Sequence, residues 1–307
     1  MKNDWSVDYQ ITTDGERIFY RYNFSPEQVS HQNVLIFNYG LVCSHQHYEK
    51  QIDFLSALGH PILLHDYRGH YQSSGIDRIE AITFENLASD LFEITQTLNI
   101  NHLTLIGHSM GVNVCLEYAK RFPDQVEKMV LIAGTIIPVF NIMLNSNTID
   151  FVNPIARKLL KKFPKAFDKL WKTGGKNPLV KKIISDGGFN MDEVPKEYIE
   201  LYVNKLGSLG PEIFFQLINE MHDHDILSFI HDIKAPALII GGDQDKVIPN
   251  FLQRLLHKEL AHSSLYIIRN GSHVPQVDFP DLVNERVKLF LGDPMLQAEQ
   301  TSDPSLT

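Results

Sequence analysis

The chain has 307 residues, of which 43% are hydrophobic and 21% charged, a composition that excludes fibrous, collagen-like and wholly disordered proteins. Its net charge of −9 argues against general nucleic-acid binding, because a polyanion repels an acidic surface. The charge is unevenly placed, since residues 155–183 carry +9 and the remainder therefore carries −18.

The predicted elements begin with a hairpin, in which residues 7–11 and 17–22 flank a turn at 13–15. Short apolar runs that we predict as strands follow at 34–39, 62–67, 103–107 and 126–133. Helix-length stretches lie between them at 47–58, 83–98 and 110–121. Strands that are apolar throughout and alternate with helices indicate a mostly parallel sheet covered by helices on both faces.

The strand pattern stops near Gly134 and resumes with predicted strands at 235–241 and 264–269 and a last helix at 280–291. The residues between have helical periodicity and no convincing strand. We therefore expect an α/β core formed by residues 1–134 and 232–291, with residues 135–231 inserted as a helical cap. The tail, residues 292–307, has few large apolar side chains and is expected to be disordered.

Cys43 and Cys115 are too few for a disulfide framework, and we expect two free thiols in a reducing compartment, although the sequence does not test their pairing. The first residues lack an apolar signal region, and no run reaches the roughly eighteen apolar residues of a membrane span. We therefore predict a cytoplasmic protein.

A candidate nucleophile, Ser109, lies between a predicted strand and a predicted helix, in the sequence Gly-His-Ser-Met-Gly. A serine on such a sharp turn is held above the sheet edge, and glycines flank it because the backbone is crowded there. A serine hydroxyl is a poor nucleophile, so a base and a group that orients the base must lie elsewhere. Two later strands end near Asp243, Asp245 and His273, at the same edge of the predicted sheet.

These motifs, in the chain order Ser, Asp, His, resemble those of the α/β-hydrolase-fold serine hydrolases of the carboxylesterase and lipase type, over residues 5–291. The family's Gly-x-x-Asp-x-x-x-Pro stretch matches residues 242–249. The resemblance implies Asp245, rather than Asp243, as the acid that orients His273.

The resemblance also implies two donors to the oxyanion, the backbone N–H groups of Met110 and Leu41. Leu41 follows the dipeptide Tyr39-Gly40, where the family usually has His-Gly. A backbone donor tolerates this change, whereas the shape of the acyl pocket depends on it. Residues 66–70 resemble a loop that is mainly structural in the family.

Several other residues have two interpretations. The His-x-His pairs at 45–47 and 222–224 lack a third ligand at a defined spacing, so we predict neither metal nor cofactor. Cys43, two residues beyond Leu41, is either a redox-sensitive neighbour of the site or, as we prefer, an inert buried hydrophobe. His108 and His70 are predicted to make local hydrogen bonds.

The basic segment, residues 155–183, consists of two amphipathic pieces, the first of which begins with a good helix start at Asn153-Pro154. In the second, apolar side chains oppose lysines: Phe167, Leu170 and Trp171 against Lys165, Lys169 and Lys172. One interpretation is a lid whose lysines face water. The other is an interfacial helix that docks on an anionic membrane or draws in an anionic substrate.

The predicted function is hydrolysis of a carboxylic ester with an apolar acyl or alcohol part, through Ser109, His273, Asp245 and an acyl-enzyme. The apolar side chains of the cap favour a small apolar ester as partner. On this fold the same triad also serves carbon–carbon bond hydrolases, amidases and cofactor-free haloperoxidases. A ligand-binding signalling receptor that retains the triad is a further alternative.

Overall fold

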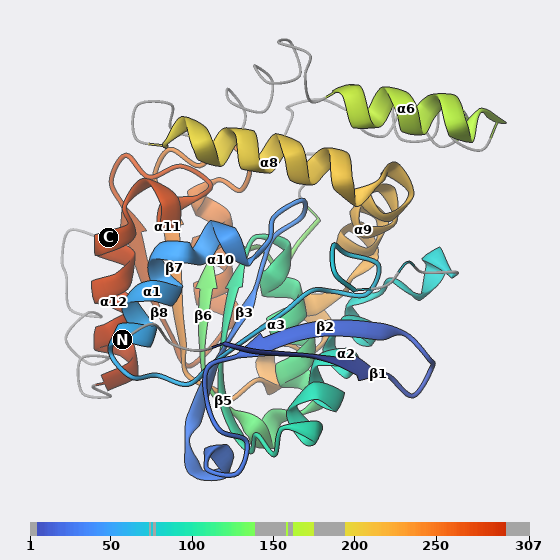
Figure 1. Ribbon diagram of the computed structural model, residues 1–307. Coiled ribbons are helices and arrows are strands. Elements are labelled where there is room, and N and C mark those ends of the chain that lie inside the picture. The colour runs from blue at the N-terminus through green and yellow to red at the C-terminus, as the bar shows by residue number, and fades with distance from the viewer. Residues whose placement is uncertain are drawn as a thin grey trace.

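The computed structural model describes residues 5–73, 75, 78–138, 158, 162–174 and 194–292. Its strands form one eight-stranded sheet in the order β1-β2-β4-β3-β5-β6-β7-β8. The strands are β1 (Ser6–Ile11), β2 (Arg17–Tyr22), β3 (Asn33–Asn38), β4 (Ile62–His65), β5 (His102–His108), β6 (Val126–Ile132), β7 (Ala237–Gly242) and β8 (Ser263–Ile268). The hairpin β1–β2 is antiparallel and β2 joins β4 antiparallel, whereas every pairing from β4 to β8 is parallel (Figure 1). The predicted mostly parallel sheet is confirmed.

Most of the described helices lie in the connections between strands, and two follow the last strand. They are α1 (Glu49–Ala57), α2 (Phe84–Thr97), α3 (Met110–Arg121), α6 (Pro164–Gly174), α8 (Lys196–Leu209), α9 (Pro211–Asp223), α10 (Asn250–Glu259), α11 (Pro275–Asp278) and α12 (Pro280–Gly292). Short 3₁₀ helices lie at Val29–His31, His45–Tyr48, Ile79–Ala81, Pro123–Gln125, Ile226–Ser228 and Ile230–Asp232. Four of the long helices, α1, α2, α3 and α12, lie where the sequence predicts them, while α10 was not predicted. None of the helices in the described ranges is long and apolar enough to cross a membrane.

Two apolar layers cover the sheet, one on each face. Val34 and Ile36 of β3 belong to the layer that contains side chains of α2 and α3. Leu35 and Phe37 belong to the opposite layer, with side chains of α1 and α12. Successive side chains of a strand point to opposite faces, so a strand covered on both faces is apolar throughout. This explains why the apolar runs locate the central strands.

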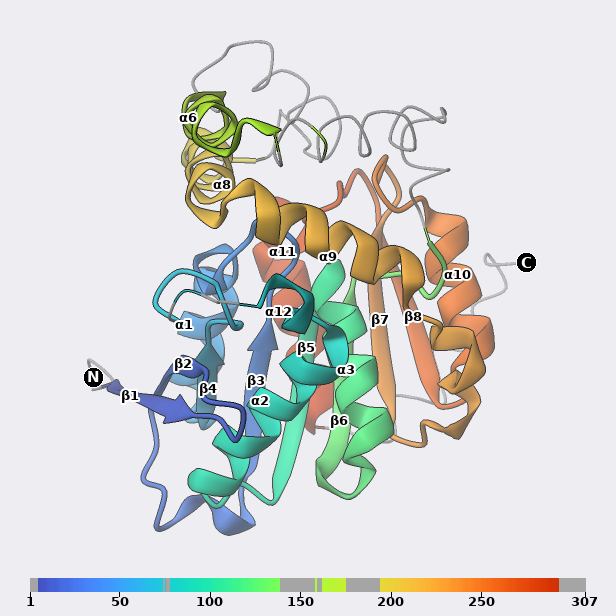
Figure 2. The same cartoon turned by 90° about the vertical axis from the view of Figure 1, so that its right-hand side faces the viewer.

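The helices α6, α8 and α9, which lie between β6 and β7 in the chain, lie over the carboxyl edge of the sheet, with α6 outermost (Figures 1 and 2). Polar contacts join their last helix, α9, and the turn after it to the core. The Glu220 carboxylate accepts a hydrogen bond of 2.9 Å from the backbone N–H of Phe84, at the start of α2. His224 Nε2 lies 3.0 Å from Glu117 Oε2 on α3. The predicted helix start at Asn153-Pro154 and the tail beyond Gly292 lie outside the described residues.

The outermost helix, α6, packs through two aromatic side chains. Trp171 and Phe167 stack on each other and contact Phe215 of α9. The Trp171 indole N–H also donates to the Leu206 carbonyl of α8 at 2.8 Å. Leu170, on the same predicted apolar face, is instead 69% exposed. Of the three side chains on the predicted apolar face, Phe167 and Trp171 therefore pack against α8 and α9, whereas Leu170 is mostly exposed.

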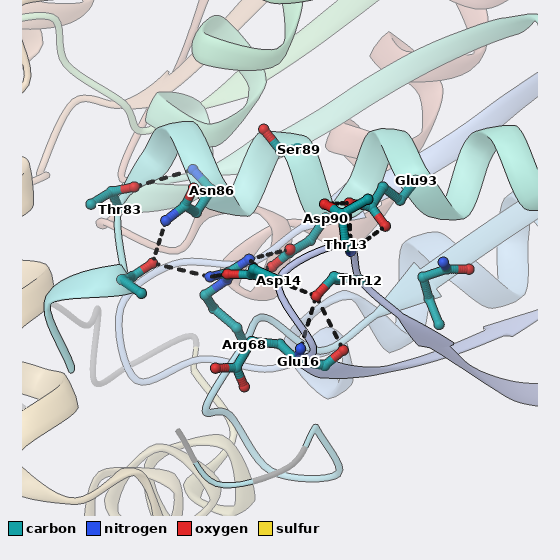
Figure 3. Close-up of polar contacts among 12 residues, drawn as sticks. Thr12, Thr13, Asp14, Glu16, Arg68, Thr83, Asn86, Ser89, Asp90 and Glu93 are labelled. Atoms are coloured by element: carbon teal, nitrogen blue, oxygen red, sulfur yellow. Dashed lines mark hydrogen bonds and ion pairs between the residues drawn. The ribbon is translucent and has the colours of Figure 1, made fainter. Parts of the chain in front are cut away.

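A buried arginine ties the N-terminal hairpin to the sheet and to α2 (Figure 3). Arg68, in the loop after β4, donates from Nε to Asp90 of α2 at 2.8 Å and from Nη1 to Asp14 of the hairpin turn at 2.9 Å. Asn86 of α2 and Arg68 both donate to the carbonyl of Ala81. These contacts agree with the mainly structural role expected for residues 66–70.

Candidate active site

The candidate nucleophile, Ser109, stands on a strained turn between β5 and α3. Its φ of 53° and ψ of −120° are rarely adopted by residues other than glycine, and this strain is held by the packing around it. A Cβ on Gly111 would overlap the carbonyl group of Asn38, and a Cβ on Gly107 would lie 2.7 Å from Cys115 Sγ. The flanking glycines are therefore required by close approach of the backbone.

Three side chains from different strand ends form a hydrogen-bonded row. His273 Nε2 lies 3.0 Å from Ser109 Oγ, and His273 Nδ1 lies 3.0 Å from Asp245 Oδ2. The Asp245 side chain is fully buried and that of His273 is 12% exposed. Asp243, the other candidate acid, is exposed, and its backbone N–H donates to Ile268. The structure thus brings together Ser109, His273 and Asp245.

The second oxygen of Asp245 explains why this carboxylate faces the histidine in one orientation. Oδ1 accepts hydrogen bonds from the backbone N–H groups of Val247 at 2.9 Å and Ile248 at 2.8 Å. Oδ2 is left for the Nδ1–H of His273. With its proton on Nδ1, the neutral imidazole presents Nε2 as an acceptor to the Ser109 hydroxyl.

His108, next to the nucleophile, makes a long-range contact that the sequence does not reveal. Its Nε2 donates to the backbone carbonyl of His273 at 2.8 Å, across a separation of 165 residues. Burial holds the pKa of His108 well below its usual range, so this donor is neutral. The prediction of a local hydrogen bond for His108 is wrong, because the loop of His273 folds back against β5.

The loop after β3 passes directly beside the nucleophile. A Cβ on Gly40 would lie 3.1 Å from Ser109 Cβ. The next residue is Leu41, in a turn closed by the Cys43 N–H and the Gly40 carbonyl at 3.0 Å. Met110 is the first residue of α3, so its N–H has no acceptor within the helix. Met110 thus follows Ser109 directly in the chain, and Leu41 follows Gly40, which lies beside Ser109 in space.

The remaining candidates do not gather into a second site. Both cysteines are free and buried, and burial raises the pKa of Cys43 to about 12, which disfavours the reactive thiolate. His222 contacts Asp223, whereas His224 contacts Asn113 and Glu117. Within the described ranges, no three His, Cys, Asp or Glu side chains are grouped so as to hold a metal ion.

Comparison with known proteins identifies the family. The sequence profile of the alpha/beta hydrolase fold matches residues 33–280. The chain belongs to the α/β-hydrolase family. The match confirms the predicted family and the predicted fold.

Relatives in this family are distant. Human protein ABHD8 is 28% identical over 263 residues, which are 84% of this chain and 55% of ABHD8, so the chain spans about half the length of this curated relative. The bifunctional esterase/perhydrolase DCH of Acinetobacter calcoaceticus is 24% identical over 277 residues, 89% of this chain and 92% of that protein. The solved structure of an esterase from Exiguobacterium antarcticum has a TM-score of 0.73 at 20% identity, covering 94% of this chain and 100% of its own. At such identity the structural likeness shows the fold alone.

Proposed function

We propose that this α/β hydrolase cleaves carboxylic esters with an apolar acyl or alcohol part, with Ser109 as nucleophile. The observation that carries the proposal is the row from Ser109 through His273 to Asp245, with 3.0 Å between hydrogen-bonding atoms at each step. A serine beside a base that a buried carboxylate orients is the arrangement that activates a hydroxyl for acyl transfer.

The reaction follows from these positions. As Ser109 Oγ attacks the ester carbonyl, its proton moves to His273 Nε2, and Asp245 stabilises the imidazolium that forms. The N–H groups of Leu41 and Met110 donate to the oxyanion. Collapse breaks the ester bond, and His273 returns the proton to the departing alcohol. Water then attacks the acyl-enzyme with His273 as base, which releases the acid and restores the serine.

The surroundings of the two proposed oxyanion donors favour an apolar substrate. Leu41 and Met110 belong to an apolar cluster that also includes cap side chains. Those side chains are Tyr202 of α8 and Ile213, Leu217 and Met221 of α9. Apolar walls with a few convergent polar groups are typical of small-molecule sites. The relative named as a bifunctional esterase/perhydrolase supports an ester as the substrate.

A chain-length series of p-nitrophenyl esters, assayed on wild type, Ser109→Ala and the control Ser89→Ala, which changes a half-buried serine of α2, tests the proposal. We expect turnover of one or more esters, a loss of several orders of magnitude in Ser109→Ala and no loss in the control. Ester hydrolysis that survives in Ser109→Ala within about tenfold would remove the nucleophile. Turnover of anilides or β-diketones, but of no ester, would replace the ester proposal by amide or carbon–carbon bond cleavage.

We also propose that the basic segment, residues 155–183, docks on an anionic lipid surface through α6. Phe163 and Leu170 are 53% and 69% exposed, and the lysines beside them at 162, 165, 169 and 172 are exposed as well. An apolar ridge bordered by lysines matches the chemistry of an anionic bilayer interface, which takes up the ridge and attracts the charges.

Vesicle co-sedimentation tests this docking with three variants. Wild type should bind vesicles that contain phosphatidylglycerol more than neutral phosphatidylcholine vesicles, and less at high salt. Phe163→Gln and Leu170→Gln should weaken binding, whereas Phe251→Gln, which changes a side chain that is 54% exposed on α10, should not. Equal binding to both vesicles, or no binding at low salt, would refute the proposal.

A further inference from the structure

Three tyrosine hydroxyls hold the loop that carries the proposed donor Leu41. Tyr48 donates to the carbonyl of Asn38 at 3.2 Å, and Tyr67 donates to that of Tyr39 at 2.9 Å. Further along the loop, Tyr71 donates to the carbonyl of Cys43 at 2.7 Å. The backbone between Asn38 and Cys43 is thus fixed at both ends by side chains from other segments.

The turn between these fixed ends is strained. The Cys43 N–H bonds to the Gly40 carbonyl, which makes Leu41 and Val42 the central residues of the turn. Val42 has a φ of 65°, as the second central residue of a type II turn does, but that position is normally glycine or asparagine. For a β-branched residue the left-handed region is a strained conformation. Relaxation of Val42 to a negative φ would release this strain and would displace the backbone of the turn, which includes Leu41.

Tyr71 is itself held in an unusual conformation. Its φ is 40°, in a turn closed by the Ser73 N–H and the His70 carbonyl, at a position where a positive φ normally calls for glycine. On the cap side, the Lys205 Nζ of α8 lies 4.0 Å from the centroid of the Tyr71 ring. Two strained turns are therefore joined by one hydrogen bond, from the Tyr71 hydroxyl to the Cys43 carbonyl, under a cap helix.

We propose that Tyr71 is a positioning residue for the oxyanion site, whose hydroxyl keeps the strained Val42 turn from relaxing and thereby holds the Leu41 N–H beside Ser109. The inference rests on the proposed function, because the position of the Leu41 N–H matters for the reaction only if Leu41 is an oxyanion donor. The strain at Val42 favours relaxation of the turn, and the hydrogen bond from Tyr71 opposes that relaxation. Backbone strain of this kind persists only where the surroundings enforce it.

The kinetic test compares Tyr71→Phe with Tyr118→Phe, which removes a buried hydroxyl that donates to Gln125 in the apolar layer on the opposite face of the sheet. Tyr71→Phe should lower kcat for a p-nitrophenyl ester about tenfold, less than the 10²- to 10³-fold loss that follows removal of a whole oxyanion donor. Its KM should stay within about twofold, and its affinity for an alkyl boronic acid should fall with kcat. Tyr118→Phe should leave kcat within about twofold.

A double mutant distinguishes a specific role of Tyr71 in holding the Val42 turn from a general loss of packing around the site. Glycine carries no strain at a φ of 65°, so in a Val42→Gly background Tyr71→Phe should cost less than about threefold. The same tenfold loss in both backgrounds, a change confined to KM, or no loss in Tyr71→Phe would each overturn the proposal. Thermal unfolding shows whether each variant is folded at the assay temperature.

Hydrogen exchange provides a readout that does not depend on activity. The amides of residues 41–43 should exchange faster in Tyr71→Phe than in wild type or Tyr118→Phe. If wild type hydrolyses no ester, the proposed function fails, whereas faster exchange would still establish that Tyr71 holds this turn. Unchanged exchange at residues 41–43 would overturn the holding role even in an active esterase.

Discussion

Asp245→Asn should abolish most activity by turning the imidazole of His273 to the wrong tautomer. The two oxygens of Asp245 have different partners: Oδ1 accepts two backbone N–H groups, at 2.9 and 2.8 Å, and Oδ2 faces His273 Nδ1. An asparagine has one accepting and one donating end. Placing its NH₂ against two donors would leave buried groups unsatisfied, at about 1–3 kcal/mol each. The amide oxygen should therefore take the Oδ1 position and the NH₂ should face Nδ1.

In that arrangement Nδ1 becomes an acceptor and the proton of His273 moves to Nε2. A protonated Nε2 can no longer accept the proton of Ser109. We expect kcat to fall about 10⁴-fold, the loss that the wrong tautomer causes in a Ser-His-Asp enzyme. This corresponds to about 5 kcal/mol of transition-state stabilisation.

The assay is steady-state hydrolysis of the best p-nitrophenyl ester, with Asp243→Asn as the matched control two residues away. Asp243 is exposed, so its variant should keep kcat within about twofold. Near-native thermal unfolding of both variants would show that the fold is retained. A larger loss in Asp243→Asn, or a loss below tenfold in Asp245→Asn, would refute the assignment of the acid.

Three further predictions concern stability. Gly111→Ala should lower the melting temperature by several degrees, because its Cβ would overlap the carbonyl group of Asn38; an unchanged melting temperature would contradict this close approach. Asp90→Asn should cost about 3 kcal/mol in urea unfolding, because it removes one carboxylate from the buried Arg68; a loss below about 1 kcal/mol would show that Asp14 alone suffices. Burial raises the pKa of Asp66 from 3.8 to about 6, so its stabilising contribution is complete below pH 3.8 and is lost as the pH rises through 6. Between pH 4 and pH 7 the free energy of unfolding of Asp66→Asn should therefore rise relative to that of wild type by up to about 3 kcal/mol. If the unfolding free energies of the two proteins change with pH in parallel, this burial effect is excluded.

The central strands and the nucleophile turn can be predicted from sequence because their constraints are local. Residues 34–37 are apolar in succession, since both faces of β3 are covered, and the observed strand is Asn33–Asn38. Gly107 and Gly111 mark the crowded turn of Ser109, where Cβ atoms do not fit. The choice of Asp245 over Asp243 depended on a family pattern, because both aspartates follow the same strand.

Other features depend on contacts between distant segments and leave no local signal. The hydrogen bond from His108 to the His273 carbonyl spans 165 residues. The positive φ of Val42 contradicts the preference of valine, so a propensity argument would miss it. The exposure of Leu170 follows from how α6 rests on α8 and α9, since helical periodicity groups apolar side chains without saying which of them find a partner.

Covalent labelling with a fluorophosphonate tests most directly whether Ser109 is the activated nucleophile. The serine oxygen would form a bond to phosphorus as the P–F bond breaks, and fluoride would leave with the proton that His273 removed. We predict one adduct per chain by intact mass, located at Ser109 by peptide mapping, and none in Ser109→Ala. An adduct on another residue, or equal labelling of wild type and Ser109→Ala, would contradict the proposed mechanism.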